Sequence, residues 1–239
     1  MALRELIYNS LTYSISYEIL NQNKSDTILF LHGWGSNKEI MKQAFGNELK
    51  EFRLIFLDLP GFGGSSITKP IRTDDYAKIV KLFLSSLNIE DFSVVGHSFG
   101  GKIASILNPK NLILLSSAGI VTEKPLKVKI KIKLFKFFKN IFPKSKMYKF
   151  FASSDVDGMS QIMYEVLKTV VDEDFESIFK KVTSKTFIFW GEKDTATPLS
   201  GGKKISKLIK NSSFYPLEGD HFFFLSNSKF ITKVMNEQL

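Results

Sequence analysis

The chain has 239 residues with a formal net charge of +9; 44% are hydrophobic, 24% are charged and none is cysteine. This length and composition favour one α/β domain with an inserted subdomain, and the lack of cysteine excludes disulfides, thiolate metal sites and a thiol nucleophile. No uncharged apolar run is long enough to cross a bilayer, and residues 1–6 show no secretory signal, so we expect a cytoplasmic protein.

Predicted strands and helices alternate up to residue 119. Residues 11–19 alternate apolar and polar side chains, which predicts a half-exposed strand near a sheet edge. Continuous apolar runs predict strands buried on both faces at 27–31, 53–57, 92–95 and 111–115. A capping box with Ser36 as N-cap and Glu39 at the third helical position predicts a helix to about residue 50, and a second helix begins at Thr73.

The alternation stops between residues 120 and 181. Ten lysines lie between residues 124 and 154, without any arginine, aspartate or glutamate, so the rest of the chain has a formal charge of −1. We interpret residues 120–181 as a helical, lysine-rich cap with one basic face, rather than as part of a generally basic fold. The alternation resumes with a strand at 186–190, a helix at 198–210, a short strand at 214–217 and a terminal helix at 227–237.

Strands that alternate with helices predict an α/β fold with a mostly parallel sheet and helices on both faces. We therefore expect residues 1–119 and 182–239 to form the core. The cap would be inserted after the sixth strand.

The segment Gly96-His97-Ser98-Phe99-Gly100 follows a predicted strand and precedes a predicted helix. Its G-x-S-x-G frame is typical of a nucleophile elbow, in which a serine on a tight turn exposes its hydroxyl. The glycines are needed because the strand and the helix approach closely there. The frame alone occurs by chance in ordinary turns, so Ser98 needs a base and an acid elsewhere in the chain.

The chain has three histidines, and His221 is the best candidate for the base. Its loop and that of Ser98 both follow strands, and the carboxyl ends of parallel strands meet at one rim of a sheet. His97 should point away from the serine, and His32 is interpreted as structural. Asp194, just after a strand, is the expected acid, while Asp220 should brace its own loop.

Two backbone N–H groups are the expected oxyanion hole. One belongs to Phe99, the residue after the nucleophile, and the other to Trp34 in the turn after the 27–31 strand. No metal or organic cofactor is expected.

Five motifs follow one another along the chain: HGWG at 32–35, DLPGFGGS at 58–65, GHSFGG at 96–101, GEKD at 191–194 and GDH at 219–221. In these motifs the chain resembles the α/β-hydrolase superfamily. The resemblance implies a Ser98–Asp194–His221 triad, an oxyanion hole at Trp34 and Phe99, and a lid formed by residues 120–181.

The expected reaction is cleavage of a carboxylic ester or thioester, as in carboxylesterases, through an acyl-enzyme on Ser98. The cap offers apolar side chains for an acyl pocket: Phe135, Phe138, Phe142, Met159 and Met163. HGWG with a basic cap is also similar to pimeloyl-acyl carrier protein methyl ester esterases, which favours a carrier-bound ester. A carbon–carbon bond hydrolase and a non-catalytic binding module remain alternatives.

The partner expected from these features is a small or carrier-bound acyl ester. The lysines of the cap would suit an acidic protein or an anionic membrane surface, and no nucleic acid is expected. A solvated lysine face without a partner is the competing interpretation.

Overall fold

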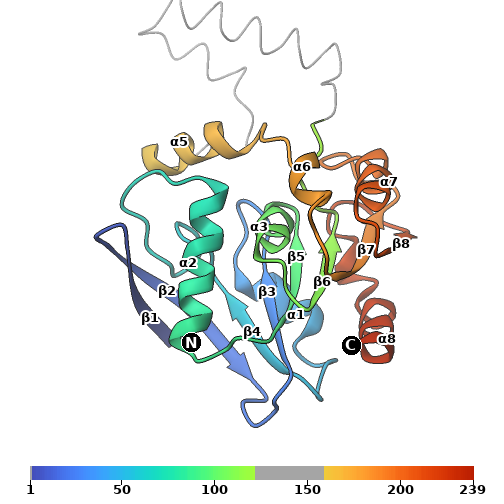
Figure 1. Ribbon diagram of the computed structural model, residues 1–239, viewed down its shortest axis with the longest axis horizontal. Coiled ribbons are helices and arrows are strands. Elements are labelled where there is room, and N and C mark those ends of the chain that lie inside the picture. Colours follow the sequence, from blue (N-terminus) through green and yellow to red (C-terminus); the bar gives the residue numbers. More distant parts are fainter. Residues whose placement is uncertain (1, 122–158) are drawn as a thin grey trace, which may run out of the picture.

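The computed structural model describes residues 2–121 and 159–239. An eight-stranded sheet runs through them in the order β1-β2-β4-β3-β5-β6-β7-β8 (Figure 1). The strands are β1 (Ala2–Tyr8), β2 (Leu11–Leu20), β3 (Thr27–Leu31), β4 (Arg53–Leu57), β5 (Ser93–His97), β6 (Asn111–Leu115), β7 (Lys185–Gly191) and β8 (Ser212–Leu217). β1 and β2 pair antiparallel, and the strands from β4 to β8 are parallel, which confirms the predicted sheet.

Helices cover both faces of this sheet (Figure 1). On one face lie α1 (Lys38–Phe45) and α8 (Ser228–Gln238), and on the other lie α2 (Thr73–Ser86), α3 (Phe99–Leu107) and α7 (Leu199–Leu208). Alternate residues of β3 feed the two cores: Ile28 and Phe30 pack with α1 and α8, while Leu29 packs on the opposite face. This is why the strand is apolar without a break.

One local prediction is wrong, and one strand was missed. Helix α1 begins at Lys38, with Asn37 as its N-cap, and it ends at Phe45 rather than near residue 50. Gly46 is the C-cap of the helix, and Leu49 is fully buried in the irregular segment that follows. Strand β1 was not predicted, because it lies at the sheet edge and exposes large apolar side chains such as Ile7, so it has no regular apolar face.

The described end of the predicted cap is helical. It contains α5 (Gln161–Val170) and α6 (Glu176–Phe179), and it follows β6, where the insertion was predicted. In Figure 1, α5 lies across one end of α2, and its buried residues Met163 and Val166 belong to the core between sheet and helices. The ten lysines, and Phe135, Phe138 and Phe142 of the predicted pocket, lie outside the described residues. Within the described residues, no helix is long and apolar enough to cross a membrane.

The order of the strands decides which loops meet. β3 and β5 are neighbours, yet the chain leaves β3 toward β4 on one side and leaves β5 toward β6 on the other. Such a switch point separates the following connections and opens a crevice at the carboxyl ends of the strands. The HGWG turn after β3 and the serine turn after β5 flank this point.

Candidate active site

The predicted nucleophile, Ser98, lies in a sharp turn between β5 and α3. Its backbone has φ 50° and ψ −112°, a combination that is strained for any residue with a Cβ. Two glycines make the turn possible. A Cβ on Gly96 would lie 2.6 Å from the carbonyl oxygen of Gly100, and a Cβ on Gly100 would lie 2.4 Å from that of Leu31. The predicted elbow geometry is therefore present.

Asp194 and His221 come together from separate loops, after β7 and β8. Nδ1 of His221 lies 2.8 Å from Oδ2 of Asp194, and the carboxyl group is buried while the imidazole is 18% exposed. Because an ionised carboxylate can only accept, Nδ1 carries the hydrogen and donates it. Nε2 then keeps its lone pair, which is what a general base requires.

Four hydrogen bonds hold the carboxylate of Asp194. Oδ1 accepts from the N–H groups of Ala196 and Thr197, both at 2.9 Å. Oδ2 accepts from the Thr197 hydroxyl at 2.8 Å, besides His221. Burial alone would raise the pKa of Asp194, but the bond and charge of His221 and the Thr197 N–H hold the pKa below its usual range. The carboxylate can therefore stabilise a protonated His221.

The serine turn and the His221 loop are joined by a hydrogen bond. His97, the neighbour of Ser98, donates from Nε2 to the carbonyl oxygen of His221 at 3.0 Å. Among the described residues, the ring of His221 bonds only to Asp194 and Thr197, so no bond to the Ser98 hydroxyl is formed. Catalytic hydrogen bonds are often long without substrate and tighten on binding. The structure thus brings all three predicted residues to one rim.

His32 and Asp220, the other residues weighed as base and acid, support the surrounding backbone. His32 is fully buried; its Nδ1–H donates to the Gly33 carbonyl at 2.8 Å, and its Nε2 accepts from the Leu59 N–H at 3.1 Å. Burial lowers the pKa of His32 to about 4, so it is neutral near pH 7. Asp220 accepts from the N–H of Phe222 at 2.8 Å and braces its own loop, as predicted.

The two predicted oxyanion donors lie beside the nucleophile. A Cβ on Gly33, which precedes Trp34, would come within 3.2 Å of the Ser98 Cβ. The Trp34 ring meets the Phe99 ring edge-on, with 5.6 Å between centroids. Neither backbone N–H donates to another described residue, and that of Phe99 stands at the N-terminus of α3, where negative charge is favoured. Their joint role as an oxyanion hole stays a prediction.

Residues 26–111 match the family model of the alpha/beta hydrolase fold. Over these residues, which are well under half of the chain, the sequence is similar to the α/β-hydrolase superfamily. Over 96 residues it is 31% identical to the 2-succinyl-6-hydroxy-2,4-cyclohexadiene-1-carboxylate synthase of Escherichia coli. That match covers 40% of this chain and 37% of the relative, so the chain matches well under half of the relative's length.

Solved structures with the same fold can be superposed on nearly the whole of this chain. An esterase from Exiguobacterium antarcticum has a TM-score of 0.75 and 23% identity, with 95% of each chain covered. A meta-cleavage product hydrolase from Pseudomonas fluorescens has a TM-score of 0.72 and 15% identity, covering 99% of this chain and 98% of that one. At such identities the likeness shows the fold alone.

Two methionines of the predicted acyl pocket lie in the described part of the chain. Met163 of α5 is buried over the loop after β4, since a Cβ on Gly61 would lie 2.3 Å from its sulfur. Met159 is partly buried and packs against the same core. Both methionines thus contact the core, and their contact with a substrate stays a prediction.

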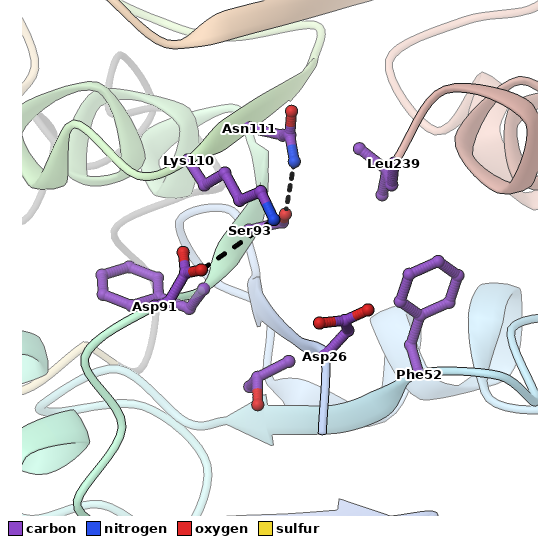
Figure 2. Close-up of a pocket in the computed structure, with 9 residues that line it drawn as sticks. Asp26, Phe52, Asp91, Ser93, Lys110, Asn111 and Leu239 are labelled. Carbon is purple, nitrogen blue, oxygen red and sulfur yellow. Dashed lines mark hydrogen bonds and ion pairs between the residues drawn. The ribbon is translucent and has the colours of Figure 1, made fainter. Parts of the chain in front are cut away.

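A small pocket lies at the opposite end of the sheet, near the amino ends of β3, β5 and β6 (Figure 2). Two pairs of its polar side chains interact with each other: Asn111 donates to Ser93 at 3.0 Å, and Lys110 pairs with Asp91 at 3.9 Å. The pocket is remote from Ser98 and does not belong to the candidate site. Among the described residues, no cluster of three His, Asp or Glu side chains is suited to hold a metal ion.

Thr197 is a site residue that the sequence analysis missed. Its N–H and hydroxyl both donate to Asp194, and its hydroxyl lies 3.3 Å from Nδ1 of His221. A local signal existed, because an aspartate followed by a threonine three residues later commonly closes a turn through its side chain. Ser116, fully buried after β6, is a second missed neighbour; its hydroxyl accepts from Gly191 at 3.4 Å.

Proposed function

We propose that the protein is a serine hydrolase that cleaves a carboxylic ester or thioester with an apolar acyl group. The observation that carries this proposal is the buried Asp194–His221 bond on the rim where the strained Ser98 turn emerges. A buried carboxylate bonded to a largely buried imidazole suits a base that becomes charged during a reaction, because the carboxylate stabilises the imidazolium.

In the first half of the reaction, Oγ of Ser98 attacks the acyl carbon while Nε2 of His221 takes the hydroxyl proton. The carbonyl oxygen becomes an oxyanion, which the N–H groups of Trp34 and Phe99 would stabilise. When the tetrahedral intermediate collapses, His221 returns the proton to the leaving alcohol or thiol. The acyl group then remains on Ser98 as an ester.

In the second half, His221 removes a proton from a water molecule, and the resulting hydroxide attacks the acyl carbon. A second tetrahedral intermediate releases Ser98, which regains its proton from His221. The products are a carboxylic acid and the free enzyme. Asp194 keeps its negative charge throughout and stabilises each imidazolium.

Covalent labelling tests the proposal directly. A fluorophosphonate probe should label the wild-type protein once, and Ser98→Ala should abolish labelling and nearly all ester hydrolysis while circular dichroism and thermal unfolding stay unchanged. Mass spectrometry after rapid quenching with a short ester should find the acyl group on the peptide that contains Ser98. Labelling that persists in Ser98→Ala would overturn the assignment and favour a binding module.

A carbon–carbon bond hydrolase is the second candidate. A serine, histidine and aspartate in this arrangement do not by themselves distinguish the two reactions, and a meta-cleavage product hydrolase is among the solved structures with this fold. Activity on a vinylogous ketone with no acyl-enzyme by mass spectrometry would favour this candidate. Activity on esters and thioesters with a trapped acyl-enzyme would favour the first.

The ten cap lysines support a refinement of the substrate: an ester on an acidic carrier protein or an anionic surface. Lysines suit long-range steering, which raises association rates and weakens with salt. Reversal of Lys129, Lys133 and Lys136 to glutamate should lower kcat/KM for a carrier-bound ester, more strongly at low salt, and leave a small neutral ester unchanged. Equal salt dependence for both substrates would instead favour the interpretation that the lysines form a solvated face without a partner.

A further inference from the structure

The proposed reaction does not use His97, although this residue lies next to the nucleophile. It ends β5, and only 1% of its surface is exposed. Its ring is packed among aromatic rings of the His221 loop, with centroids 4.6 Å from His221, 5.4 Å from Phe222 and 4.8 Å from Phe224. Packing alone would be served equally well by an apolar aromatic residue.

Of the two ring nitrogens of His97, only Nε2 makes a hydrogen bond, and it acts as a donor. Nε2 lies 3.0 Å from the carbonyl oxygen of His221; a carbonyl can only accept, so Nε2 carries the hydrogen. Nδ1 is buried without a hydrogen-bond partner, and it faces Gly33, where a Cβ would come within 2.8 Å. An unsatisfied buried acceptor is destabilising. The imidazole therefore carries a cost that its single N–H donor must offset.

His97 also carries no charge at working pH. Burial, followed by the nearby charge of His221, lowers the pKa of His97 to about 3. The groups that face it are the His221 ring and backbone, Gly33, Phe222, Phe224 and, more remotely, Asp194 and His32. Its contribution near pH 7 is thus a hydrogen bond of fixed direction.

We propose that His97 is a positioning residue for the base of the reaction. Its Nε2–H holds the backbone of His221 while Asp194 holds the ring at Nδ1, so that Nε2 of His221 is aimed at the Ser98 hydroxyl. Among the described residues, His97 is the only hydrogen-bond partner of the His221 carbonyl. Because His97 and Ser98 are consecutive, this one bond fixes the base relative to the nucleophile itself. The inference rests on the function proposed above.

Two variants separate the donor from the ring. His97→Phe keeps an aromatic ring and removes the donor, whereas His97→Gln keeps an amide N–H of similar reach. In His97→Phe, kcat for a short ester should fall about 10- to 100-fold, as for a misplacement of the base by a fraction of an ångström, while KM and the thermal midpoint stay close to wild type. His97→Gln should recover a large part of kcat. Phe224→Leu, which alters packing around the same ring, serves as the control and should lower the midpoint more than kcat.

A spectroscopic readout does not depend on activity. ¹⁵N NMR of the wild-type protein should show His97 as the Nε2–H tautomer from pH 5 to 9, and the downfield Nδ1 proton of His221 should broaden or vanish in His97→Phe. A wild-type Nδ1–H tautomer, or wild-type kcat with an unchanged His221 proton in His97→Phe, would overturn the proposal. If Ser98→Ala remained active, the proposed function would fail instead, and the NMR result would still report whether His97 holds His221.

Discussion

Replacing Lys38 by methionine should destabilise the protein strongly, because this lysine is one half of a buried ion pair. Its Nζ lies 2.8 Å from Oδ2 of Asp58, and the two side chains are only 4% and 0% exposed. The Lys38 backbone N–H and the Gly64 N–H also donate to this carboxylate, at 2.7 and 2.9 Å. The pair joins the start of α1 to the loop after β4, beside the HGWG turn.

The size of the effect follows from what the variant leaves behind. Methionine fills a similar volume but removes the ammonium, so the Asp58 carboxylate stays buried with two backbone donors and no counter-charge. Removing one partner of a buried pair costs about 3–5 kcal/mol, and the two remaining donors argue for the lower end, about 3 kcal/mol. For a chain of this length that corresponds to a fall in Tm of about 6–12 °C.

The same pair gives a pH dependence with a definite sign. Burial would raise the pKa of Asp58, but the Gly64 N–H and the bonds and charge of Lys38 hold the pKa below its usual range. A carboxylate with a lowered folded-state pKa stabilises the fold above its unfolded-state pKa, and that stabilisation is lost as the pH falls through the folded-state value. In Lys38→Met the effect of burial on the pKa of Asp58 is no longer offset by the lysine. The loss of unfolding free energy relative to wild type should therefore shrink as the pH is lowered and Asp58 becomes protonated.

Urea unfolding, followed by tryptophan fluorescence and circular dichroism between pH 4 and pH 8, measures both effects. Lys193→Met is the matched control: Lys193 pairs with Glu218 at 3.0 Å, but the side chains are 70% and 81% exposed, so no measurable change is expected. An unchanged midpoint for Lys38→Met at pH 7, or a deficit that grows toward low pH, would refute the reasoning.

Three further predictions concern the site and its support. Asp194→Asn should lower kcat about 10⁴-fold, whereas Asp220→Asn should have a small effect; the reverse order in steady-state assays would mean that the acid was chosen wrongly. Gly100→Ala should yield insoluble protein or abolish fluorophosphonate labelling, because its Cβ would lie 2.4 Å from a backbone oxygen; normal labelling would contradict the close approach. Lys102→Met should destabilise the fold by about 1–3 kcal/mol in urea unfolding, because its buried Nζ donates to the Val170 carbonyl at 2.7 Å and thus ties α5 to α3; an unchanged midpoint would show that this link is dispensable.

Features that depend on neighbours in the chain were well predicted. The buried strands are apolar without interruption, so their positions could be assigned, and the elbow needs only five consecutive residues around Ser98. The end of a helix was predicted less well, as α1 shows: it stops at Phe45, while Leu49 is buried outside the helix. Periodicity reports burial, and burial does not require a helix.

The chemical identity of the candidate site was largely determined by the sequence. Ser98, Asp194 and His221 each follow a predicted strand. Because the carboxyl ends of parallel strands lie at one rim of the sheet, these residues could be expected to meet there. Only the tertiary structure decided how these residues are held. The Asp194–His221 bond and the His97–His221 bond join segments that lie 27 and 124 residues apart in the sequence. Such contacts depend on the packing of whole layers to within a fraction of an ångström, and no local pattern of residues encodes that distance.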